Sequence, residues 1–245
     1  MTVNGLAGWS ESSFTADGKT LPVFRQGTGP GVVIVHEIPG ITPTVQQFAQ
    51  DVVDSGFTVV MPSLFGTPGD PMNVWTVAKS VARVCISSEF ANLALNTTSP
   101  ITTWLRALAA DLHAELGGPG VGALGMCATG GFALAMMVDP SVVAPVLSQP
   151  SMPFAVTPAR GRDLNLSPAD LDSVKARVAA GCPVLGLRYS GDPAVGGRFD
   201  TLRRELGDGF VAVELPGRKH GVLTEDRDEP SVQRVLEFFH DRLDG

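Results

Sequence analysis

The sequence predicts an α/β fold, with a mostly parallel central sheet and helices on both of its faces. Short continuous apolar runs at 32–35, 57–61, 121–124 and 184–189 are typical of strands that are covered on both sides. Helical apolar periodicity separates these runs, and strand and helix alternate from residue 32 onward. Because no repeat or linker divides the 245 residues, we expect one domain over residues 1–245.

The amino-terminal third contains clear turn and cap signals. Apolar segments flank Asp17-Gly18, a strong tight-turn pair, and so predict a hairpin over about residues 12–25. After the strand at 32–35, Thr42 is suited to cap a helix that begins at Pro43. Gly56 ends that helix before the strand at 57–61.

The remaining elements follow from the same signals of periodicity, caps and breakers. We expect a loop at 62–72, loop plus helix at 74–95, a helix from Ser99-Pro100 to Gly117, a strand at 121–124, a buried helix at 132–138, a strand at 142–147, a surface excursion at 149–166, a helix from Ser167 to Gly181, strands at 184–189 and 210–214, and a helix at about 230–243. Pro145 is an awkward residue for a central strand.

Composition and charge exclude several classes of protein. The net charge is −7 and no run of Lys and Arg stands out, so nucleic acid and anionic membrane are not expected partners. No apolar run approaches the ~18 residues of a membrane span, and the first residues lack a secretion signal, so a cytoplasmic location is expected. The three cysteines form no CxxC pair, which disfavours disulfides and a zinc site.

The segment around Cys127 carries the strongest chemical signal. A buried strand runs into Gly125-Met126-Cys127-Ala128-Thr129-Gly130-Gly131 and then into a buried helix. A sharp strand-to-helix turn needs small residues around its apex, as in the nucleophile elbow of the α/β-hydrolase fold. At the start of a helix the dipole favours a thiolate. The alternative is a small core cysteine beside a tight packing turn.

A base and an orienting acid follow in the chain order expected of this fold. Asp192 comes just after the strand at 184–189, and His220 lies in the loop after the strand at 210–214. His220 would take the thiol proton while Asp192 fixes its tautomer. Taken singly, Asp192 could be a turn former and His220 a solvated loop residue. The other candidates fit the order less well: His113, His240, Asp200, Asp226 and Asp228.

The segment His36-Glu37-Ile38-Pro39-Gly40 follows the strand at 32–35, at the sheet edge where α/β proteins bind ligands. We assign the two oxyanion amides to Ile38 and Ala128. Glu37 would then lie beside the thiol, which makes sense if it takes part in proton control. The alternative is a helix-entry loop whose Glu and His face solvent, and for His36 we prefer that alternative.

The motifs HEIPG at 36–40, GMCATGG at 125–131, SGDPAV at 190–195 and PGRKHG at 216–221 together resemble the dienelactone hydrolase family. The resemblance implies a Cys127-His220-Asp192 triad, with Glu37 interacting with the resting thiol and releasing it when substrate enters. It implies no metal and no organic cofactor. The family hydrolyses lactones of unsaturated dicarboxylic acids, and related members cleave other esters.

The sequence departs from the family pattern in two places. Thr129 intervenes where founding members have glycine, which suggests a slightly wider turn. The segment 61–66 lacks the usual string with a nearby arginine, and the first arginine after it is Arg83. Arg83 could clamp a substrate carboxylate or could be a surface helix residue.

We therefore expect a hydrolase acting on a small-molecule ester or lactone through a thioester on Cys127. The alternatives are a broad-specificity carboxylesterase or thioesterase, a non-catalytic ligand-binding protein on the same scaffold, and a redox-sensing cysteine. Phe65, Trp75 and residues 150–154 could line an apolar pocket, although core packing is the preferred role for them. The sequence leaves open whether the protein is a monomer or a homodimer.

Overall fold

The computed structural model describes residues 6–86 and 95–245, except the side chains of residues 81–86. The eight strands are β1 (Ser10–Ala16), β2 (Lys19–Gln26), β3 (Gly31–Val35), β4 (Thr58–Pro62), β5 (Val121–Met126), β6 (Val142–Ser148), β7 (Val184–Tyr189) and β8 (Phe210–Leu215). The helices are α1 (Pro43–Asp54), α2 (Val74–Ile86), α3 (Ile101–Leu116), α4 (Gly130–Met136), α5 (Pro168–Ala179), α6 (Arg198–Leu206) and α7 (Glu229–Leu243). This order confirms the predicted alternation of strand and helix.

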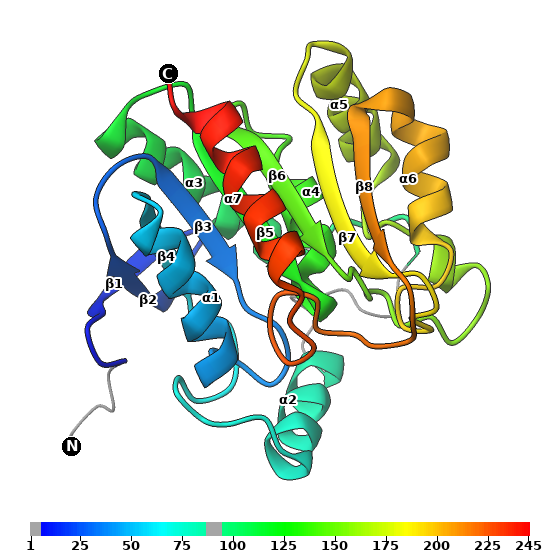
Figure 1. Ribbon diagram of the computed structural model, residues 1–245, viewed down its shortest axis with the longest axis horizontal. Helices are drawn as coiled ribbons and strands as arrows, with labels where there is room; N and C mark the ends of the chain where they lie inside the picture. The colour runs from blue at the N-terminus through cyan, green and yellow to red at the C-terminus, as the bar shows by residue number, and fades with distance from the viewer. Residues whose placement is uncertain (1–5, 87–94) are drawn as a thin grey trace.

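The strands form a single sheet in the order β1-β2-β4-β3-β5-β6-β7-β8. β1 and β2 are the antiparallel hairpin predicted from Asp17-Gly18, and both turn residues have the positive φ that a tight hairpin turn requires. β2 joins β4 in antiparallel fashion, and every pairing from β4 to β8 is parallel. The sheet is therefore mostly parallel, as predicted (Figure 1).

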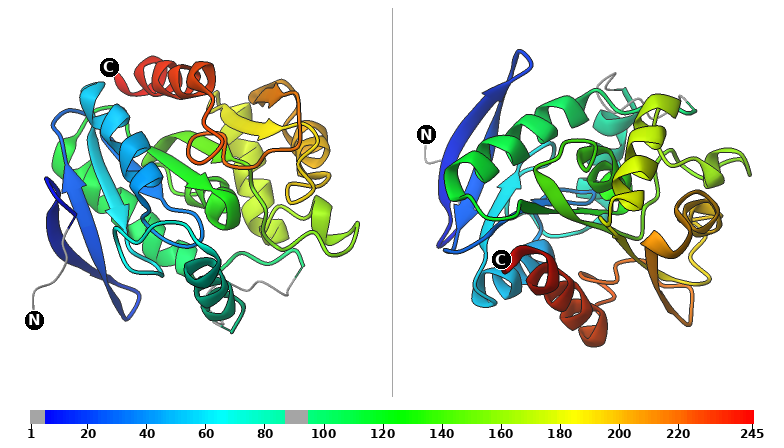
Figure 2. Two further views of the ribbon diagram at one scale, coloured as in Figure 1. Left: turned by 60° about the horizontal axis from the view of Figure 1, so that its bottom comes forward. Right: turned by 90° about the horizontal axis from the view of Figure 1, so that it is seen from above.

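Helices cover both faces of the sheet and bury two separate apolar clusters. Along β3, Val33 and Val35 belong to the cluster under α3, α4, α5 and α6, whereas Val32 and Ile34 belong to the cluster under α1 and α7. This alternation follows from the period-2 geometry of a strand. The end-on view shows α1 and α7 together on one side of the sheet and α3 on the other (Figure 2).

The cap predicted at Thr42 is present, and Ser167 caps α5 in the same way. Thr42 accepts the amide of Val45 at the start of α1, and Ser167 accepts the amide of Asp170 at the start of α5. Each such cap stabilises its helix by roughly 1 kcal/mol. Pro145 does lie within β6, but β7 pairs with β6 only from Val146 onward.

The segment predicted as loop plus helix contains α2, and residues 87–94 of it lie outside the described part of the chain. α2 lies beyond the carboxyl edge of the sheet instead of on either face (Figure 1). None of the described helices has the length and apolar character needed to cross a lipid bilayer.

Candidate active site

Cys127 lies at the apex of a sharp turn between β5 and a short 3-10 helix, Cys127–Thr129, that leads into α4. Its backbone has a φ of +51°, which is costly for a residue with a side chain. Gly125 fits here because an added Cβ would stand 2.2 Å from the carbonyl oxygen of Thr129. This tight turn between strand and helix is the one predicted for the segment.

Thr129, which departs from the family's glycine, has a structural role in the turn. Its buried hydroxyl lies 2.9 Å from the carbonyl oxygen of Val35 and 3.1 Å from that of His36, and it accepts the amide of Met126 at 3.1 Å. The side chain thus ties the end of β3 to the turn after β5. Where a glycine would give the turn a flexible backbone, the threonine side chain instead connects the ends of β3 and β5 by hydrogen bonds.

His220 lies in the loop after β8, and its Nδ1 is 2.6 Å from Oδ2 of Asp192, which follows β7. The Asp192 side chain is only 2 % exposed, and its other oxygen accepts the amide of Ala194. The backbone amide of His220 donates to Asp226. Two aspartates thus hold this histidine, one by its ring and the other by its backbone.

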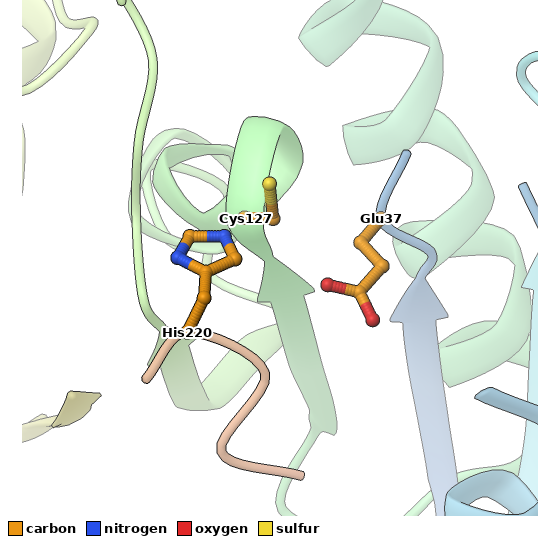
Figure 3. Close-up of side chains that lie close together, drawn as sticks. All are labelled: Glu37, Cys127 and His220. Atoms are coloured by element: carbon orange, nitrogen blue, oxygen red, sulfur yellow. The ribbon is translucent and has the colours of Figure 1, made fainter. Parts of the chain in front are cut away.

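The ring of His220 also lies beside the sulfur of Cys127. Ligand atoms of Glu37, Cys127 and His220 all lie within 4.8 Å of one another (Figure 3). Burial lowers the pKa of His220, but hydrogen bonds to Asp192 and Cys127 and their negative charges outweigh it and raise the pKa to about 11. This environment favours the protonated ring of His220 beside the sulfur.

Glu37 is almost fully buried, at 2 % exposed, and approaches Cys127 from the end of β3. Its Oε1 accepts the hydroxyl of Thr224 at 2.5 Å, and its Oε2 lies 3.4 Å from Nε2 of Gln149. Burial raises the pKa of Glu37, against the opposing effect of these two neutral donors and of the nearby His220. A carboxyl group in this position can hold a proton close to the thiol.

His36 does not face solvent, so the prediction for this residue is wrong. The ring is fully buried, its Nε2 accepts the amide of Leu64 at 3.1 Å, and its Nδ1 lies 3.0 Å from the carbonyl oxygen of Glu37. Burial lowers the pKa of His36 to about 4, which keeps the ring neutral. His36 therefore connects the backbone at Glu37 to the chain at Leu64, which follows β4.

The loop that contains Ile38 and the first turn after Cys127 also lie together at the carboxyl edge of the sheet. Within the described residues, no group accepts a hydrogen bond from the backbone amide of Ile38. The amide of Ala128 belongs to the first turn of a helix, where backbone N–H groups have no partner within the helix. Both amides are thus suited to hold a developing negative charge.

The other candidate residues lie in different surroundings, some in the core and some on helices. Phe65 is a core residue, as expected, and its ring lies edge-on to that of His36. Trp75 is 86 % exposed at the start of α2, so core packing is wrong for it. Arg83 falls within α2, but its side chain lies outside the described residues. His113 and His240 are helical, on α3 and α7.

Sequence reasoning missed three polar residues of the site: Thr224, Gln149 and Ser151. Gln149 directly follows β6 and Ser151 lies three residues beyond its end, so their position after a parallel strand was an available signal. Thr224 lies four residues after His220, and no comparable signal identifies it. In terms of ligand chemistry, Glu37, Cys127 and His220 could hold a zinc ion; the expectation of no metal stays a prediction.

Comparison with known proteins places the chain among hydrolases. The model of the family described as "Dienelactone hydrolase family" matches residues 21–241. No curated protein matches the sequence. Among solved structures, a dienelactone hydrolase from Anabaena variabilis ATCC 29413 has a TM-score of 0.67 at 18% identity and covers 96% of this chain and 99% of its own.

Two esterases are also similar in structure. A cold-adapted esterase from an Arctic intertidal metagenomic library has a TM-score of 0.62 at 17% identity, covering 99% of this chain and 100% of its own. Brefeldin A esterase, described as a bacterial homologue of human hormone sensitive lipase, has a TM-score of 0.59 at 15% identity, covering 96% and 76%. At such identities the likeness is one of fold.

Proposed function

The chain belongs to the dienelactone hydrolase family and has the α/β-hydrolase fold, and on that premise we propose that it hydrolyses a small-molecule ester or lactone through Cys127. Membership of the family supports an ester or lactone hydrolase. The observation that carries the mechanism is the contact of His220 with Asp192 at 2.6 Å, with the same ring beside the Cys127 sulfur.

In the proposed reaction, His220 holds the proton that Cys127 has given up, and Asp192 fixes the ring. The thiolate attacks the substrate carbonyl carbon and forms a tetrahedral oxyanion. As that intermediate collapses, the bond to the leaving oxygen breaks and His220 protonates that oxygen, which leaves a thioester. Water then attacks the thioester, His220 takes its proton, the acid is released and the thiolate is restored.

The amides of Ile38 and Ala128 are proposed to hold the oxyanion in both steps. Two fixed backbone donors at a water-poor site stabilise the charge that develops in the transition state. The amide of Ile38 has no acceptor in the described part of the chain, and Ile38 and Ala128 are only 8 % and 3 % exposed, which supports this assignment.

Glu37 is proposed to control the proton on the nucleophile. Its carboxyl group is buried next to Cys127 and His220, with Thr224 and Gln149 as donors. Burial raises the pKa of Glu37, and this favours a protonated carboxyl group, which would avoid a second negative charge beside the thiolate–imidazolium pair.

The proposed substrate class is a small ester or lactone. A carboxylate on the substrate would be held by Arg83 if that residue acts as a clamp, which suits a dienelactone. Without the clamp, simple aryl esters or thioesters would be the better substrates.

The test compares steady-state hydrolysis of a panel of aryl esters, thioesters and dienelactones by the wild type, Cys127→Ala and Cys182→Ala. Cys182 is a matched control, because it is a buried cysteine whose sulfur lies 3.4 Å from the carbonyl oxygen of Val143. We expect Cys127→Ala to lower kcat/KM by at least about 10³-fold and Cys182→Ala to leave it near the wild-type value. Equal rates for Cys127→Ala and the wild type would refute the proposal and favour a binding protein.

A further inference from the structure

Ser151 contacts the sulfur of Cys127 and has no part in the mechanism above. Its hydroxyl lies 3.3 Å from Sγ, and the residue is only 3 % exposed. The described residues offer this hydroxyl no other hydrogen-bond partner. The position three residues beyond the end of β6 puts Ser151 at the same sheet edge as Cys127, on the neighbouring strand.

The backbone holds Ser151 against the nucleophile turn. Its amide donates to the carbonyl oxygen of Cys127 itself at 2.9 Å. Gly130 makes this approach possible, because an added Cβ at that position would stand 2.6 Å from Cα of Pro150. The glycine after the turn thus allows the chain beyond β6 to come close, and Ser151 is brought to the sulfur as a result.

Arg198 fixes the chain on the other side of Ser151. Its guanidinium group is 1 % exposed and donates to the carbonyl oxygens of Met152 and Pro153, which follow Ser151 directly. The same group donates to the carbonyl oxygens of Ala194 and Val195, just beyond Asp192. One buried arginine therefore binds both the segment after Ser151 and the loop after Asp192, and so fixes the position of one relative to the other.

We propose that the Ser151 hydroxyl is a catalytic hydrogen-bond donor to the Cys127 thiolate. This proposal rests on the proposed function of Cys127 as nucleophile. A hydroxyl donates more strongly to a thiolate than to a neutral thiol, because the acceptor then carries a full charge. Ser151 keeps its own proton throughout, so it stabilises the thiolate before attack and again when the thioester breaks and sulfur leaves.

The proposal predicts a change in the pH dependence of the thiol, which a merely structural serine would not cause. We expect Ser151→Ala to raise the midpoint for alkylation of Cys127 by iodoacetamide by about one pH unit, the size of one hydrogen bond to a charged group. Alkylation is followed on the Cys127 peptide by mass spectrometry, so that Cys85 and Cys182 do not contribute. Hydrolysis of the thioester should slow as well, because the leaving thiolate is less stable.

Two variants serve as controls. Ser151→Thr retains a hydroxyl and should keep the midpoint close to that of the wild type. Ser141→Ala removes a buried side-chain hydroxyl that has no hydrogen-bond partner among the described residues, on a serine that precedes β6 at the opposite edge of the sheet. It should leave the midpoint unchanged.

The outcomes separate the two proposals. A lowered wild-type midpoint that rises in Ser151→Ala but not in Ser151→Thr supports the role of Ser151. A lowered wild-type midpoint that Ser151→Ala leaves in place overturns that role and leaves Cys127 as nucleophile. A wild-type midpoint near that of a free thiol, about 8.5, counts against both proposals.

Discussion

The loops after β3 and after β8 each bring a histidine to the carboxyl edge of the sheet, and the two rings have opposite acid–base properties. Burial lowers the pKa of His36 to about 4, and its hydrogen bond to the carbonyl group of Glu37 only partly opposes this effect. Burial also lowers the pKa of His220, but Asp192 and Cys127 raise it to about 11. The anionic partners therefore decide which histidine can carry a proton in the reaction.

The difference also determines how each ring affects stability with pH. A folded pKa below the ordinary value of 6.5 means that His36 costs stability as pH falls from 6.5 toward 4. A folded pKa above that value means that His220 contributes stability that is lost as pH rises from 6.5 toward 11. His36 therefore affects stability below pH 6.5, and His220 affects it above pH 6.5.

Removal of the anion beside His220 should have the largest effect. We expect Asp192→Asn to lower kcat/KM on the order of 10³-fold, because the ring loses its orientation and the imidazolium loses its partner. The pKa of His220, followed by NMR titration, should fall toward that of an ordinary histidine. Asp139→Asn is a matched control, since Asp139 accepts the amide of Ser141 away from the site. Retention of full activity by Asp192→Asn would show that the anionic partner of His220 does not decide its role in the reaction.

Removal of the hydrogen bonds of His36 should affect stability more than chemistry. His36→Phe keeps an aromatic ring beside Phe65 but leaves the buried amide of Leu64 without its acceptor. We expect a loss of about 2 kcal/mol in the free energy of unfolding at pH 7, measured with urea. The loss should shrink as pH falls from 6.5 toward 4, because only the wild type then bears the cost of a neutral buried ring. A loss that grows in acid would contradict this account.

The smallest effect is expected for the substitution Glu37→Gln, and it is a change in how stability depends on pH. Its folded pKa is raised by burial, so the wild type loses stability as pH rises above the ordinary value of 4.5. The Tm of Glu37→Gln relative to the wild type should therefore increase between pH 4.5 and pH 8. Glu115→Gln is the control, because the pKa of Glu115 is lowered by its hydrogen bond to Arg25, so its Tm difference should not increase in this way. Parallel Tm curves for Glu37→Gln and the wild type would show that the pKa of Glu37 is not raised in the folded protein.

Sequence reasoning identified the strands and the residues that follow them because both depend on local patterns. Apolar runs predicted β3, β5 and β7, and their carboxyl ends placed Glu37, Cys127 and Asp192 at one edge. The small residues around Cys127 predicted a tight turn, and the positive φ of Cys127 agrees with that expectation.

The remaining parts of the site depend on tertiary contacts that local patterns do not encode. Ser151 reaches Cys127 because Pro150 packs against Gly130, which is far from it in sequence. The burial of His36 depends on the chain at Leu64, which follows a different strand. A serine or a histidine in a loop has many possible uses, and only the approach of a second segment selects one of them.

The central claim is that Cys127 carries the acyl group during turnover. The direct measurement is to mix the wild type with a slowly hydrolysed aryl ester, quench in acid and locate the acyl group by peptide mass spectrometry. The account predicts an acyl mass on Cys127 that hydroxylamine removes and that is absent from Cys127→Ala. Turnover with no acyl group on Cys127, or with the acyl group on Ser151 instead, would contradict it.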